Sequence, residues 1–253
     1  MSTAILVALV AYFTSKKTNV EAPLINAPIG DLSGIAMQTR KGRTIFAYQG
    51  IPYAEPPVNQ LRFKKPKALS VPAWAGTFAA TSKPNRCVQM NSIKIPFFTT
   101  MGDENCLQLN VYVPKTDTKK PLPVMVWFHG GGFTSGDSSD RVYGPKYLLD
   151  KDVILVTANY RLGIFGFFTL GHTEAPGNLA MWDQHESLKW VQANIASFGG
   201  DPNKVTIFGE SSGGISVSYQ LASRKNSDKG LFHAAIIQSG PIDLPSLKAD
   251  VSR

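Results

Sequence analysis

The sequence has 253 residues, of which 43% are hydrophobic and 17% are charged, so it has the composition of a globular α/β domain with one large core and not that of a disordered chain. Its formal net charge is +8. The basic residues lie in short scattered clusters without interleaved aromatic residues, which indicates a solvated basic face and argues against nucleic-acid binding.

The chain begins with an apolar run, Ala4–Phe13, which is followed by Lys16 and Lys17. The run is too short to cross a bilayer, which takes about 20 residues. It fits the apolar region of a secretory signal peptide, although no basic residue precedes it and no clear cleavage site follows it. We assign residues 1–22 to a signal peptide or an N-terminal tail, expect a secreted protein, and leave a membrane anchor open.

Short apolar runs after this segment predict strands, and longer periodic segments predict helices. A hairpin is expected from Ile35–Gln38 and Thr44–Gln49. Further strands are expected at Leu109–Val113, Val124–Phe128, Val153–Asn159, Val205–Phe208 and Ala234–Ser239. Helices are expected at Pro145–Asp150, Trp182–Ser197 and Ser212–Ser223. Alternating strands and helices indicate a mostly parallel sheet in one domain.

The most informative motif is Gly-x-Ser-x-Gly, in which Gly209 and Gly213 flank Ser211 directly after an apolar strand. A sharp turn from strand to helix would hold the serine hydroxyl clear of its own backbone. Glycine two residues before and two after the serine leaves room for neighbouring chain. The motif predicts that Ser211 is a nucleophile.

A second apolar run, Val124–Phe128, ends in His129 and three glycines, Gly130–Gly132. Glycines allow backbone N–H groups to point at a ligand, and such groups stabilise the oxyanion that forms when a serine attacks an ester. A tight turn without a catalytic role is the alternative interpretation. The neighbouring serine motif favours the catalytic one.

Several blocks in a fixed order give the chain a clear resemblance to the N-terminal half of type-B carboxylesterases, the family that also contains cholinesterases and neuroligins. Besides the serine turn, the matching blocks are Phe46–Pro57, Leu61–Phe63, Glu104–Tyr112, His129–Phe133, Asn159–Gly163, Asp183–Gln184, Phe198–Pro202 and Gln238–Gly240. The resemblance implies an α/β-hydrolase fold, truncated here after the sixth main sheet strand, in which residues 23–253 form the N-terminal part of one domain.

The same resemblance implies a serine ester hydrolase without a cofactor or metal, acting on a small-molecule ester. Ser211 matches the nucleophile of the family, and Gly131, Gly132 and Ser212 match the positions whose N–H groups form the oxyanion hole. Alanine is commoner than serine at position 212, and an aspartate usually stands where this chain has Asn105. Neither difference removes a backbone donor.

The catalytic acid and base are not evident in this sequence. In this fold they follow the serine in the order acid, then histidine, and the 42 residues after Ser211 contain only one histidine, His233. His233 and Asp228 would formally complete a triad. However, His233 opens a strand parallel to the one before Ser211, which separates the two residues by about 20 Å. We therefore expect the acid and base in a missing C-terminal half, and an inactive fragment.

The other three histidines, His129, His172 and His185, precede the serine and do not fit that order.

Two cysteines, Cys87 and Cys106, have no histidines at metal-ligand spacing, so a metal site is not expected; buried free thiols are the alternative to a disulfide. The family resemblance implies that they form a disulfide that closes a loop beside the active site. It also implies two structural ion pairs without a catalytic role, Arg161 with Asp183 and Arg62 with Glu104.

The loop between the cysteines contains no tryptophan, whereas cholinesterases place one there to hold the choline cation. A neutral ester with apolar groups is therefore the expected substrate. Three phenylalanines either line the substrate gorge or belong to the core: Phe97, Phe98 and Phe133.

The alternative function is that of a catalytically inactive adhesion protein on the same scaffold, as in neuroligins.

Overall fold

The computed structural model describes residues 21–91, 99–223 and 230–240. Most of the assigned signal peptide or tail, residues 1–20, lies outside these ranges, and so do Phe97, Phe98 and Asp228. None of the helices in the described ranges combines the length and apolar character that a membrane crossing requires.

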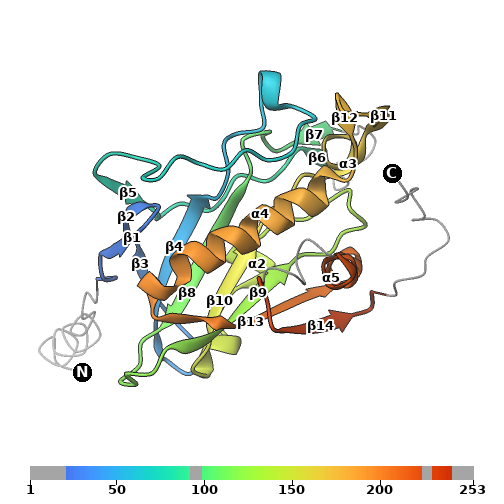
Figure 1. Cartoon of the computed structure of the whole chain (residues 1–253). Coiled ribbons are helices and arrows are strands. Elements are labelled where there is room, and N and C mark those ends of the chain that lie inside the picture. The colour runs from blue at the N-terminus through green and yellow to red at the C-terminus, as the bar shows by residue number, and fades with distance from the viewer. Residues whose placement is uncertain (1–20, 92–98, 224–229, 241–253) are drawn as a thin grey trace, which may run out of the picture.

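The described chain is organised around a seven-stranded sheet with the strand order β14-β13-β9-β10-β8-β4-β3 (Figure 1). These strands are β3 (Ile35–Gln38), β4 (Thr44–Pro52), β8 (Gln108–Pro114), β9 (Leu122–Phe128), β10 (Ile154–Ala158), β13 (Gly200–Glu210) and β14 (Ala234–Gln238). The strands β10, β9, β13 and β14 run parallel, and the remaining pairs are antiparallel. The predicted hairpin and the five further predicted strands all lie in this sheet, with the hairpin strand β3 at its edge.

Smaller sheets surround the main one in the described ranges. The strands β1 (Ile25–Ala27), β2 (Gly30–Ser33) and β5 (Thr77–Ala79) form one of them. Two pairs, β6 (Gln89–Asn91) with β7 (Thr99–Met101) and β11 (Thr169–His172) with β12 (Ala175–Pro176), form the others. None of these short strands is predicted from the sequence, because they lack a pronounced apolar run or a visible period.

Two helices pack on the sheet and on each other: α4 (Leu179–Asn194) crosses one face of the sheet, and α5 (Ser212–Ala222) lies beside β14 (Figure 1). The helix predicted at Trp182–Ser197 corresponds to α4, and it has a buried apolar stripe, since Leu188, Val191 and Ile195 are fully buried. Ile195 itself belongs to the 3₁₀ turn η3 (Ile195–Phe198) that follows α4.

The helix predicted at Pro145–Asp150 is wrong. This region has the one-turn helix α2 (Asp140–Tyr143) before Gly144, and then only the 3₁₀ turn η2 (Leu148–Asp150). The six residues of the predicted helix permit too few hydrogen bonds to offset the cost of nucleating a helix. The remaining short helical elements are α3 (Gly163–Phe167) and η1 (Asn59–Leu61).

A buried ion pair fastens α4 to the segment that follows β10. The Arg161 guanidinium donates to both carboxylate oxygens of Asp183, at 2.8 and 2.6 Å, and the Arg161 backbone N–H donates to the same carboxylate at 3.1 Å. Complete burial raises the pKa of Asp183, while the guanidinium opposes that shift. The two side chains are 4% and 0% exposed, so each depends on the other for its charge compensation.

Asp183→Asn is expected to lower the free energy of unfolding by about 3–5 kcal/mol, because it leaves the Arg161 charge buried without its counterion. Lys189→Gln on the same helix removes an exposed ion pair with Glu186 and is expected to change it by less than about 1 kcal/mol. Urea unfolding followed by tryptophan fluorescence measures both. Equal effects of the two substitutions would contradict a structural role for the buried pair.

Candidate functional site

The candidate site begins at the junction between β13 and α5. Ser211 stands there with φ 54° and ψ −124°, a conformation that L-residues rarely adopt. Its backbone N–H donates to the Gln238 carbonyl in β14 at 2.9 Å, and its carbonyl accepts from the Ile215 N–H at 2.9 Å. The turn is thus held by both the neighbouring strand and the helix, as expected for a serine presented at the end of a strand.

The two flanking glycines are required by close backbone contacts, as the sequence predicted. A Cβ atom on Gly209 would lie 2.4 Å from the Gly213 carbonyl oxygen. A Cβ atom on Gly213 would lie 2.1 Å from the Phe128 carbonyl oxygen at the end of β9. Any side chain at either position would therefore push the start of α5 away from the sheet.

The glycine loop, which we define as residues 129–136, lies against this serine turn. A Cβ atom on Gly130 would be 3.3 Å from the Ser211 Cβ and 2.9 Å from a carboxylate oxygen of Glu210. The loop closes on itself, since the Gly131 carbonyl accepts from the N–H groups of Thr134 and Ser135 at 3.1 Å each. Segments separated by some 80 residues in the sequence therefore meet within van der Waals distance.

Three backbone N–H groups are available beside Ser211. Gly131 and Gly132 have φ values of 114° and 61°, and within the described residues neither N–H donates a hydrogen bond. Ser212 is the first residue of α5, so its N–H has no acceptor inside the helix. The positive end of the helix macrodipole lies at the same place.

His129 is a packed residue of the glycine loop. It is 1% exposed, its ring stacks on Tyr160 with centroids 4.4 Å apart, and its Nδ1 lies 2.8 Å from the Gly130 carbonyl. The Tyr160 hydroxyl donates to the His129 carbonyl. Burial lowers the pKa of His129 to about 4, so the ring is neutral at pH 7.

His233 lies at the opposite end of the sheet from Ser211, as the parallel strands predicted. Its N–H donates to the Val205 carbonyl at 2.8 Å, and its Nδ1 accepts from the Val205 N–H at 3.3 Å. Val205 precedes Ser211 by six residues along β13, and β14 pairs in parallel with it from Thr206 and Ala234 onward. His233 therefore does not act on Ser211.

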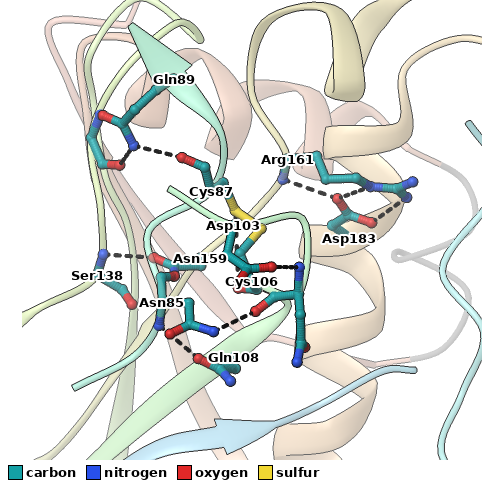
Figure 2. Close-up of a disulfide and its surroundings, with 12 residues drawn as sticks. Asn85, Cys87, Gln89, Asp103, Cys106, Gln108, Ser138, Asn159, Arg161 and Asp183 are labelled. Carbon is teal, nitrogen blue, oxygen red and sulfur yellow. Dashed lines mark hydrogen bonds and ion pairs between the residues drawn. A yellow bond between two sulfur atoms is a disulfide. The ribbon is translucent and has the colours of Figure 1, made fainter. Parts of the chain in front are cut away.

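A disulfide joins Cys87 and Cys106, which confirms the pairing implied by the family resemblance (Figure 2). Beside it, the Arg62 guanidinium makes a two-pronged ion pair with Glu104, at 2.5 and 2.6 Å. Within the described ranges, no cluster of three or more His, Cys, Asp and Glu side chains is arranged to hold a metal ion.

Phe133 is only 8% exposed and packs against Phe167 with ring centroids 5.0 Å apart. Its carbonyl accepts a hydrogen bond from the Gly163 N–H at 2.7 Å. This packing places Phe133 in the core of the glycine loop rather than on an open gorge wall.

A strand that turns sharply into a helix at a serine, beside a glycine loop, is typical of the α/β-hydrolase fold. A family model described as the carboxylesterase family matches residues 21–250, and the chain belongs to this family.

Three curated relatives illustrate the range of the family. The chain is 45% identical to "Acetylcholinesterase 1" of Caenorhabditis briggsae over 85% of its length, and 46% identical to "Juvenile hormone esterase" of Tribolium castaneum over 86%. It is 44% identical to "Carboxylesterase 5A" of Canis lupus familiaris over 90%. The matched part covers 36%, 36% and 41% of these relatives, so the chain spans about two fifths of their length.

Acidification is expected to destabilise the protein through His129. In the unfolded chain the His129 ring has a pKa near 6.5, whereas in the folded protein its pKa is about 4. The unfolded state therefore holds more protons between these values, and the free energy of unfolding falls by about 3 kcal/mol as the pH decreases from 6.5 to 4. His129→Asn should remove this part of the pH dependence.

Urea unfolding at pH 7.0, 5.5 and 4.0 measures the effect, with His172→Asn at the exposed end of β11 as the matched control. An unaltered pH dependence in His129→Asn would contradict the assignment to this ring.

Proposed function

We propose that the complete protein is a serine carboxylic ester hydrolase and that Ser211 is its nucleophile. The observation that supports the proposal is the contact between the Ser211 turn and the glycine loop, in which the N–H groups of Gly131 and Gly132 have no acceptor among the described residues. This arrangement is what acyl transfer through a tetrahedral intermediate requires.

In the proposed reaction, the Ser211 hydroxyl oxygen attacks the carbonyl carbon of the ester and transfers its proton to a general base. The negative charge that develops on the carbonyl oxygen is stabilised by the N–H groups of Gly131, Gly132 and Ser212 and by the N-terminal end of α5. Collapse of the intermediate expels the alcohol, which takes up the proton, and leaves an acyl group on Ser211. Water then attacks the acyl group in the same way and regenerates the serine.

The general base is expected in the part of the relatives' length that this chain does not span. His129 is packed against Tyr160 and bonded within its own loop, and His233 is fastened to Val205. The order serine, acid, histidine supports the same placement. On its own, the 253-residue chain would therefore turn over esters about a millionfold more slowly than the complete enzyme.

A neutral ester with apolar groups is the proposed substrate class, and secretion is the proposed localisation. The segment between Cys87 and Cys106 has no tryptophan to bind a choline cation. The disulfide itself is a bond that persists in oxidising compartments. The relatives named above include both a cholinesterase and other esterases, so the substrate has to be measured.

Ser211→Ala in the complete protein is expected to lower kcat for 4-nitrophenyl butyrate by about a millionfold, because the nucleophile is lost. Labelling by a fluorophosphonate probe should be lost with it. The exposed Ser70→Ala serves as the control and should keep both. A wild-type protein that neither hydrolyses esters nor reacts with the probe would overturn the proposal and favour a non-catalytic adhesion protein.

The substrate class is checked by comparing 4-nitrophenyl butyrate with butyrylthiocholine on the complete protein. We expect kcat/KM to be roughly tenfold higher for the neutral ester, since a missing cation–π contact is worth about 1–2 kcal/mol. A preference for the choline ester would show that another aromatic group binds the cation.

A further inference from the structure

The glycine loop is held at its far end by a residue of the disulfide loop, which we define as residues 85–106. Gln89, in β6, donates from its amide nitrogen to the Gly136 carbonyl at 2.8 Å and accepts from the Gly136 N–H at 2.9 Å. The same amide nitrogen donates to the Cys87 carbonyl at 3.0 Å (Figure 2). One side chain thus joins the backbone of the disulfide loop to the backbone of the glycine loop.

Gly136 transmits this contact to the start of the loop. It has a φ of 117°, and a Cβ atom there would lie 2.4 Å from the His129 Nδ1 and 2.6 Å from the Gly130 carbonyl oxygen. The backbone of Gly136 therefore rests directly on the residues that precede Gly131 and Gly132. If Gly136 moves, Gly130 loses the surface against which it packs.

The other fastenings of the loop come from a different part of the chain. The Tyr160 hydroxyl donates to the His129 carbonyl, and the Gly163 N–H donates to the Phe133 carbonyl at 2.7 Å. These contacts hold the beginning and the middle of the loop. Among the described side chains, only that of Gln89 bonds to both backbone groups of Gly136.

We propose that Gln89 is a positioning residue, which aligns the N–H groups of Gly131 and Gly132 through Gly136. The inference rests on the proposed function, since it concerns the oxyanion donors of that reaction. Donors act on the rate only when they are aligned with the developing charge, and a misaligned donor weakens binding of the transition state more than binding of the substrate. Loss of the Gln89 contacts should therefore lower kcat and leave KM nearly unchanged.

The test compares Gln89→Met with Gln108→Met in the complete protein. Both substitutions replace an amide by an apolar side chain of similar length. Gln108 accepts a hydrogen bond from the Asn85 N–H at 2.8 Å, so it also anchors the disulfide loop, but within the described residues it makes no hydrogen bond to residues 129–136. Gln108→Met therefore controls for disturbance of the disulfide loop alone.

Active sites are first counted by titration with a fluorophosphonate, so that kcat is expressed per reactive site and misfolded protein does not contribute. For Gln89→Met we expect kcat for 4-nitrophenyl butyrate to fall by about 10- to 100-fold, which is less than the loss of a whole oxyanion donor. KM should stay within about threefold. A trifluoromethyl ketone carries an oxyanion once the serine has added to its carbonyl carbon. The affinity for this ketone should decrease by the same factor as kcat/KM.

If Gln89→Met yields too few reactive sites, Gln89→Glu gives the same test, because it keeps the acceptor for the Gly136 N–H and loses both donated hydrogen bonds. Unchanged kcat and ketone affinity per reactive site would overturn the role of Gln89 and leave the proposed function intact. Equal decreases in Gln89→Met and Gln108→Met would also overturn it. A wild-type protein without turnover and without probe labelling would overturn both.

Discussion

The geometry of the site depends on one close approach, that of the first turn of α5 to the end of β9. The Cα of Gly213 lies so near the Phe128 carbonyl that no side chain fits between them. Because this contact is between backbone atoms, it fixes where the helix begins, where Ser211 stands and which way the glycine loop leaves the strand. The strained backbone of Ser211 persists because both sides of the turn are held in place.

Three consecutive residues after β10 fasten three separate segments around this contact. Asn159 accepts from the Ser138 N–H at 2.7 Å and donates to the Asn85 carbonyl at 2.6 Å (Figure 2). Tyr160 holds the His129 carbonyl, and Arg161 holds Asp183 on α4. The disulfide loop, the glycine loop and the long helix are thus attached to the end of a single strand. Buried hydrogen bonds of this kind are expensive to break, because the groups left behind cannot reach water.

The sequence predicted the central strands and the two long helices. The runs around Val124–Phe128 and Val205–Phe208 are apolar enough to predict buried strands, the segment that forms α4 is long enough to show a helical period, and the Ser211 motif requires glycine at fixed positions. The disulfide and the two ion pairs came from the family resemblance. The contacts of Gln89 with Gly136 had no such signal, because a single polar side chain says nothing about a partner 47 residues away. The prediction of a helix at Pro145–Asp150 was wrong, since local composition does not show whether a segment is long enough to form a helix.

The side chain of Ser211 differs from its surroundings in one respect. The backbone N–H and carbonyl of Ser211 are both hydrogen-bonded, yet the described residues form no hydrogen bond to the Ser211 hydroxyl. The flanking glycines support the packing of the sheet and helix, whereas no hydrogen bond among the described residues depends on the hydroxyl. The proposed reactivity and the folding of the turn are therefore encoded at different positions of the same motif. In the proposed enzyme, a single codon change at Ser211 would abolish the reaction and leave the outer surface intact, which is a short evolutionary route from a hydrolase to a protein that only binds.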